Sequence, residues 1–91
     1  MARVVVTIKI MPNSPEAQLD KIQESASKAI AEFGGDFGKA EIEPVAFGLK
    51  ALKLIFIMDE AKGTTDPLEN KIKTIAGVES VEVVDVRRTI G

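Results

Sequence analysis

The sequence contains no cysteine and no histidine. Without cysteine the chain has no disulfide bond and no thiol nucleophile, and without histidine it lacks the usual general base at neutral pH. Zinc-finger-type sites are excluded for the same reason. Carboxylates remain as ligands for a hard cation, but their spacing nowhere resembles a calcium loop. We therefore expect no catalytic residue, no metal site and no cofactor, in a protein that is not an enzyme.

Aromatic residues are scarce as well. Tryptophan and tyrosine are absent, and the aromatic residues are four phenylalanines. A surface that stacks nucleic acid bases usually needs more aromatic rings than this. The charge balance points the same way, because the formal net charge is −2 and the pI is about 5.1. A small domain of this charge has no field that draws it to nucleic acid, so we expect no direct nucleic-acid contact.

Long hydrophobic runs are also missing. The longest, from Ala51 to Met58, is interrupted by Lys53 and falls well short of the ~20 residues that span a bilayer. Arg3 and Lys9 break up the first eleven residues, which indicate a strand and not a signal peptide. We expect a cytoplasmic protein that makes no membrane contact. A chain of 91 residues is expected to form one domain, residues 1–91, with one core and no room for a deep active site.

The hydrophobic pattern predicts four strands and two helices. The apolar pattern predicts strands at 3–11, 39–46, 49–58 and 78–87, and the second half of 49–58 is apolar on both faces, as expected at the centre of a sheet. Helical spacing predicts a helix at about 15–33. A second helix is expected to start at Asp66-Pro67 and to run to about residue 76. In this order the elements favour an α+β, ferredoxin-like βαββαβ sandwich: a four-stranded antiparallel sheet with two helices on one face.

Several residues refine this prediction. Ser14 is expected to cap the first helix and Pro15 to occupy its first turn, and Gly34-Gly35 is expected to end it. Pro44 cannot donate a backbone hydrogen bond, which indicates an edge strand or a bulge. At Val83-Val84 the alternation slips, as a bulge or burial on both faces would explain.

The face of the sheet away from the helices is expected to be open. The even positions of the first strand are the more apolar and should meet the helices. In the third strand Lys53, Ile55 and Ile57 share one face, and Leu52, Leu54, Phe56 and Met58 share the other. Either set carries apolar residues outward. This indicates a partner surface or the scattered aliphatic residues that any protein surface has.

The most informative segment runs from Pro44 to Leu54, PVAFGLKALKL. It resembles the signature of the exchange domain of the translation elongation factor 1-beta family: a proline, small or apolar residues, an aromatic-glycine pair, an aliphatic residue, a lysine and an alternating strand. The resemblance extends along essentially the whole chain. It includes Asp59-Glu60 and the Lys62-Gly63-Thr64 loop after the third strand, and the length matches the single-domain archaeal members.

This resemblance implies a guanine-nucleotide exchange factor whose partner is the GTPase elongation factor 1-alpha. Members of the family disturb the magnesium and phosphate site of the GDP-bound GTPase, so that GDP leaves and GTP enters. The regenerated GTP form then binds aminoacyl-tRNA. The resemblance implies no covalent chemistry, and we expect a monomer when the protein is free.

The resemblance also suggests the partner-binding residues Phe47, Gly48, Lys50, Arg87 and Arg88. Phe47 is expected to anchor the GTPase from a loop, or else to plug the end of the core, and Gly48 to serve backbone geometry. Lys50 is expected to pair with an acidic surface or to solvate its strand. The eukaryotic relatives place a lysine next to their C-terminus. Arg87 and Arg88 stand there in this chain, and they either do related work or leave the mechanism to other contacts.

We expect Asp85 to pair with Arg87, which would leave Arg88 as the freer charge. Two other functions are alternatives to this interpretation. One is a small-molecule-sensing domain of the same fold that dimerises through its sheet edges. The other is a ribosomal or RNA-associated protein, against which the acidic pI counts.

Overall fold

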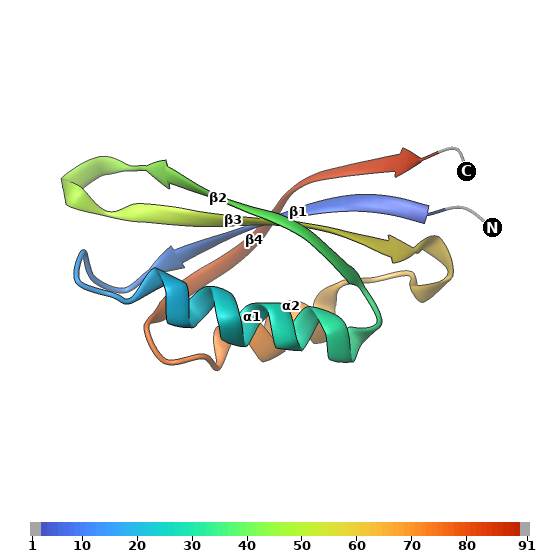
Figure 1. Ribbon diagram of the computed structural model, residues 1–91, viewed down its shortest axis with the longest axis horizontal. Coiled ribbons are helices and arrows are strands. Elements are labelled where there is room, and N and C mark those ends of the chain that lie inside the picture. Colours follow the sequence, from blue (N-terminus) through green and yellow to red (C-terminus); the bar gives the residue numbers. More distant parts are fainter. Residues whose placement is uncertain (1–2, 90–91) are drawn as a thin grey trace.

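The computed structural model describes residues 3–89 and has the expected α+β architecture. In chain order the elements are β1 (Arg3–Pro12), α1 (Leu19–Phe33), β2 (Asp36–Pro44), β3 (Lys50–Asp59), α2 (Asp66–Lys73) and β4 (Val78–Thr89). The strands form one antiparallel sheet in the order β2-β3-β1-β4, and both helices cover the same face of it (Figure 1). The predicted ferredoxin-like sandwich is confirmed.

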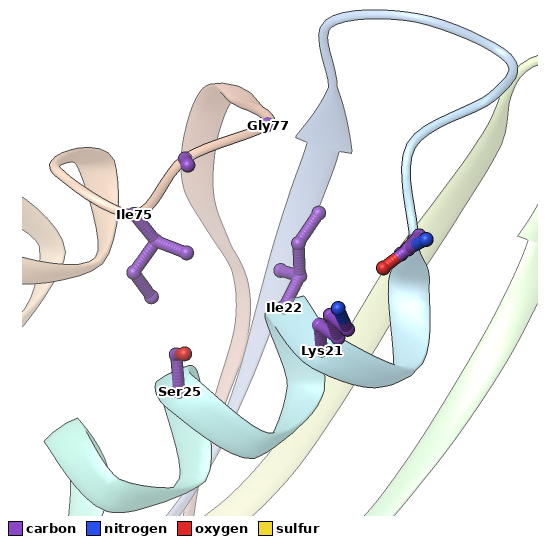
Figure 2. A pocket seen from close by; sticks show the side chains of 7 residues that line it. Lys21, Ile22, Ser25, Ile75 and Gly77 are labelled. Carbon is purple, nitrogen blue, oxygen red and sulfur yellow. The ribbon is translucent and has the colours of Figure 1, made fainter.

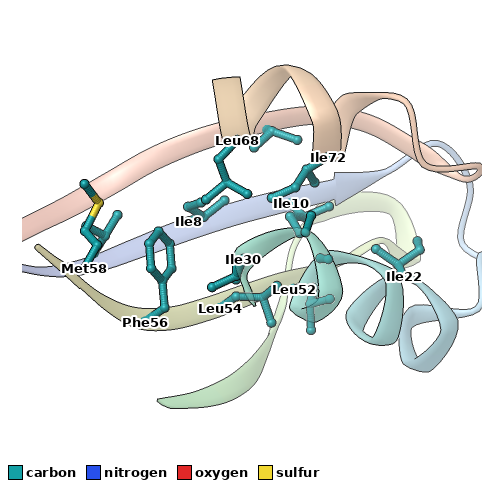
Figure 3. Packing of buried hydrophobic residues seen from close by; sticks show 14 residues of the cluster. Ile8, Ile10, Ile22, Ile30, Leu52, Leu54, Phe56, Met58, Leu68 and Ile72 are labelled. Carbon is teal, nitrogen blue, oxygen red and sulfur yellow. The ribbon is translucent and has the colours of Figure 1, made fainter. Parts of the chain in front are cut away.

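The core lies between the sheet and the helices, as the alternation in β1 predicted. Val6, Ile8 and Ile10 of β1 are buried, and their partners across the ladder in β3 are Phe56, Leu54 and Leu52. Figure 3 shows these side chains packed against the apolar faces of the two helices. Each large aliphatic side chain buried in this way contributes about 1.5–3 kcal/mol. The helices add Ile22, Ala26, Ala29, Ile30, Leu68 and Ile72 to the core.

The first helix begins at Leu19, and the predicted start at residue 15 is wrong. The side chain of Ser14 accepts a hydrogen bond from the backbone N–H of Glu16, at 3.2 Å, and its carbonyl accepts one from Ala17. Ser14 and Pro15 therefore form a turn of their own instead of a helix cap. The other end is as expected, since Gly34 has the left-handed backbone, with φ at 99°, that ends α1.

The bounds of three other elements differ by a few residues. β2 runs from Asp36 to Pro44, not from 39 to 46, and it ends at Pro44 because the Val45 N–H donates to the Leu49 carbonyl and closes the hairpin there. α2 ends at Lys73, not near 76, and β4 extends to Thr89, not to 87. β2 is an edge strand, as Pro44 indicated.

The slip at Val83-Val84 is a bulge. Val83 lies opposite Ile8 and Asp85 lies opposite Thr7, so Val84 is the extra residue. After the bulge, Val86 and Arg88 lie opposite Val6 and Val4, on the helix side of the sheet, while Asp85 and Arg87 lie on the open side.

The open face is less apolar than its sequence suggests. It carries the β3 set Lys53, Ile55 and Ile57, and both isoleucines are half-buried. Lys53 and Lys9 both approach the carboxylate of Glu43, with N–O distances of 3.1 and 4.0 Å. These ion pairs cover part of the aliphatic surface with charge. In the described part of the chain, neither helix has the length and apolar character that crossing a membrane requires.

Candidate functional site

The candidate partner-binding residues form two groups at opposite ends of the sheet. Phe47, Gly48 and Lys50 lie at the turn between β2 and β3, whereas Arg87 and Arg88 lie near the end of β4 (Figure 1). Arg87 and Ile57 both lie opposite Val5, so they are at the same position along the sheet. Lys50 is seven residues before Ile57 in β3, so Lys50 and Arg87 are roughly 23 Å apart along the strand direction. The molecule is 42 Å long, so no single compact site includes both groups.

The hairpin turn presents Phe47 to solvent. Val45 N–H donates to the Leu49 carbonyl at 2.8 Å, and Leu49 N–H donates to the Ala46 carbonyl at 3.2 Å. Phe47 lies in the turn that these two hydrogen bonds close, with φ at 60° and ψ at 34°. It is 94% exposed to solvent. The alternative interpretation, in which this ring plugs the end of the core, is wrong. Gly48 follows with φ at 75°, so two successive residues have left-handed backbone.

A left-handed backbone is unusual for a phenylalanine. It costs roughly 1–2 kcal/mol for a residue with a side chain, and glycine avoids that cost. Gly48 therefore serves backbone geometry, as predicted. Lys50 opens β3 opposite Pro44 and is exposed, and within residues 3–89 its ammonium group forms no ion pair. The turn thus combines one exposed ring with one cation that is available to a partner.

At the other end of the sheet the two arginines are held differently. Arg87 Nε donates to Asp85 Oδ2 at 3.0 Å, as expected. Arg88 Nε donates to Glu60 Oε2 at 2.9 Å, and Arg88 Nη2 donates to Glu60 Oε1. The expectation that Arg88 is the freer charge is therefore wrong, because Glu60 holds it in a two-pronged contact.

This contact shifts both pKa values. The hydrogen bond from Arg88 lowers the pKa of Glu60 below its ordinary value, although burial and the charge of Asp59 act in the opposite direction. The hydrogen bond from Glu60 raises the pKa of Arg88. Glu60 is the residue that the sequence interpretation missed. Its position next to Arg88 follows from the register, in which Asp59 and Thr89 both lie opposite Arg3.

Two hollows lie near these ends. One, of about 650 Å³, is on the helix side of the sheet below the end of β4, and Glu60 and Arg88 are on its rim. The other, of about 380 Å³, lies between the start of α1 and the turn before β4 (Figure 2). In that view Ile22 and Ile75 form its apolar wall, with Lys21 and Ser25 beside them. Among residues 3–89, no three acidic side chains gather closely enough to hold a metal ion.

Comparison with known proteins gives a consistent result. The sequence profile described as the EF-1 guanine nucleotide exchange domain matches residues 5–89. The chain is 44% identical to elongation factor 1-beta of Methanobrevibacter smithii over 97% of its own length and 98% of the relative's. It is also 44% identical to elongation factor 1-beta of Staphylothermus marinus, over 97% of this chain and 98% of that one.

A solved structure with the same fold is the C-terminal domain of the MgtC protein from Mycobacterium tuberculosis. The TM-score is 0.64 at 13% sequence identity, with 90% of this chain and 85% of that chain covered. At this identity the likeness shows the shared fold alone.

Proposed function

The chain belongs to the EF-1 guanine nucleotide exchange family, and from this premise we propose that its two sheet ends are the regions that contact the GTPase. It promotes the exchange of GDP for GTP on elongation factor 1-alpha during translation elongation. We further propose that residues 1–91 act as a single exchange domain, as a monomer when free and in the cytoplasm. In this proposal it contacts neither nucleic acid nor membrane.

Exchange requires differential binding and no covalent step. The factor must bind the nucleotide-free GTPase more tightly than the GDP-loaded form. A ten-thousandfold preference corresponds to about 5.5 kcal/mol. A chain without cysteine or histidine can supply this preference through contacts alone, so we do not class the protein as an enzyme with catalytic residues of its own.

The observation that carries the proposal is Phe47. Its ring is 94% exposed on a turn that is fixed by two backbone hydrogen bonds. An exposed aromatic ring on a rigid turn is typical of an interface anchor, which fills a pocket on the partner. Gly48 allows the turn, and Lys50 adds a cation beside the anchor.

The second proposed contact is the C-terminal end of β4. Arginine binds carboxylates and phosphates with paired N–H groups, and Arg87 and Arg88 point to opposite faces of the sheet. We expect Arg88→Ala to slow exchange more than Arg87→Ala, because Glu60 fixes the Arg88 guanidinium in place whereas a single bond holds Arg87. Release rates of the two single variants, measured at equal folded concentration, test this order.

The proposed function is tested with the cognate GTPase loaded with fluorescent GDP. Substoichiometric amounts of this protein are added with excess unlabelled nucleotide, and the release of label is followed over time. We expect release to accelerate in proportion to the protein concentration. Release rates that stay equal with and without the protein would refute the function.

A further inference from the structure

The hollow below the end of β4 has an apolar wall. Val4, Val6, Met58 and Val86 line it on the sheet side, and the loop 63–65 closes it on the other. Val86 lies opposite the buried Val6 and faces the same side as the helices, yet it is 57% exposed. Val86 is near the end of β4, and Figure 1 shows that this end of the strand extends beyond both helices. The bulge at Val84 thus places an aliphatic side chain on the helix side at a point where α1 and α2 no longer cover it.

The rim of this hollow carries a cation with unused donors. A guanidinium group has five N–H donors, and Glu60 takes up two of those of Arg88. The remaining three have no acceptor among residues 3–89, and the Arg88 side chain is 68% exposed. The free edge fits one further oxyanion in the same planar geometry.

Glu60 is itself held in place. It begins a short 3-10 helix, Glu60–Lys62, which Asp59 caps by accepting the N–H of Ala61 at 2.8 Å. Lys62, at the end of the same turn, lies over the ring of Phe33 with its ammonium nitrogen 5.4 Å from the ring centre. The turn is therefore tied to α1 on one side and to β4 on the other. The carboxylate of Glu60 can orient Arg88 because its own backbone is fixed.

We propose that this hollow receives a segment of the GTPase in which an apolar side chain stands next to a carboxylate, with Glu60 as the positioning residue for Arg88. The inference rests on the proposed function. The apolar wall takes the apolar side chain, and the free edge of Arg88 takes the carboxylate. A nucleotide phosphate satisfies the second requirement but not the first, so the occupant is a protein segment.

The test uses two pairs of variants. In each pair the same substitution is made once at a residue that lines the hollow and once at a control residue outside it. Val86→Ser removes an aliphatic side chain of the wall, and Val84→Ser removes an exposed valine of the same strand that does not line the hollow. Glu60→Gln removes the negative charge that pairs with Arg88 and one of its two acceptor oxygens, and Glu41→Gln makes the same change at the partner of Lys39 on the open face, at 3.1 Å. Each is assayed for GDP release and for the Kd of the nucleotide-free GTPase, with thermal melting as the check of folding.

We expect Val86→Ser and Glu60→Gln to weaken binding of the nucleotide-free GTPase about fivefold or more, and the two controls to bind as the parent does. The double variant of Glu60→Gln and Arg88→Ala should be no weaker than Arg88→Ala alone, because Glu60 acts through Arg88. If Val86→Ser melts early, Val86→Thr repeats the measurement with a side chain that keeps the β-branched shape and replaces one methyl group by a hydroxyl.

The results separate this inference from the function on which it rests. If the parent protein does not speed GDP release, the proposed function itself is wrong. If the parent is active but Val86→Ser and Glu60→Gln match their controls, the function stands and this inference is overturned. It is also overturned if Glu60→Gln speeds exchange, since the ion pair would then restrain Arg88. An effect that appears with GDP present and not in the nucleotide-free complex would assign the anion to the nucleotide phosphate instead.

Discussion

Phe47 combines an exposed ring with a left-handed backbone, and both features are unfavourable for the free protein. The ring is 94% exposed, although burial of a phenylalanine is normally a source of stability. Its φ of 60° adds roughly 1–2 kcal/mol of strain, which a glycine at the same position would not have. Residues with such conformations cluster at active sites, ligand clamps and switch regions.

Replacing Phe47 by alanine and by glycine separates these two effects. Both variants lack the ring, so both should lower kcat/KM for exchange by about thirtyfold, which corresponds to about 2 kcal/mol of lost anchor energy. Their stabilities should differ, because alanine keeps the left-handed strain and glycine does not. We expect the free energy of unfolding, measured in urea, to be about 1 kcal/mol larger for Phe47→Gly than for Phe47→Ala.

Phe56→Ala is the contrasting control for that pair. Phe56 is fully buried, and its loss should destabilise the fold by about 3–5 kcal/mol. If Phe47→Ala leaves the exchange rate per folded molecule unchanged, Phe47 is not part of the interface.

The ion pair of Glu60 and Arg88 predicts a pH dependence. The hydrogen bond from Arg88 depresses the pKa of Glu60 in the folded protein. A depressed carboxyl pKa contributes stability above the unfolded-state pKa, and this contribution is lost as the pH falls through the folded-state pKa. We expect Arg88→Ala to move the NMR titration midpoint of the Glu60 carboxyl upward, toward its ordinary value. A midpoint that does not change would show that the pair is not formed in solution.

At the level of the elements, the sequence predicted the type and order of all four strands and both helices. It succeeded because β1 alternates, because the continuous apolar run in the second half of β3 is typical of a central strand, and because glycine at position 34 can adopt the left-handed backbone that ends a helix. It failed at the start of α1, where the side chain of Ser14 bonds to Glu16 within a separate turn. Serine favours both turns and helix caps, and the sequence does not say which of the two forms.

The end of α1 gives a prediction at this scale. Gly34 has φ at 99°, and a Cβ there would lie 2.5 Å from Cε of Lys62. Gly63 also has a positive φ, at 76°, but its ψ of −89° lies outside the left-handed helical region, and a Cβ there would meet no atom within 4 Å. We expect Gly63→Ala to lose stability through backbone strain alone, and Gly34→Ala to lose roughly 1–2 kcal/mol through left-handed strain and a small further amount because the end of Lys62 must move away from Phe33.

Urea unfolding of the two glycine variants provides the comparison. Adding Lys62→Met to Gly34→Ala should recover the part of the loss that comes from Lys62, since methionine bends away more easily, and adding it to Gly63→Ala should recover nothing. If Lys62→Met leaves the loss caused by Gly34→Ala unchanged, Lys62 moves aside without cost.

In the whole molecule, the residues of the two proposed contacts lie at opposite ends of the sheet. The topology implies this arrangement, since β3 and β4 both run antiparallel to β1. The start of β3, where Phe47 and Lys50 lie, is therefore far from the end of β4. The pairing of Glu60 with Arg88 could not be predicted in the same way. It depends on the register of three strands and on a bulge at Val84 whose side the sequence left open.

This separation leads to a prediction about energetic coupling. Phe47 and Arg88 lie roughly 23 Å or more apart along the sheet and share no neighbour, so their contributions to exchange should be independent. We expect the free-energy losses of Phe47→Ala and Arg88→Ala to add in the double variant to within about 0.5 kcal/mol, if both contact the GTPase in the same complex.

The two losses should also respond differently to salt. The free-energy loss caused by Arg88→Ala should shrink as the salt concentration rises, because an exposed charge is screened over about 10 Å at 0.1 M. The loss caused by Phe47→Ala should persist. Exchange rates of the four proteins at low and high salt measure both effects. A double variant no worse than the poorer single variant would contradict this independence, because it would show that the contributions of the two ends are energetically coupled.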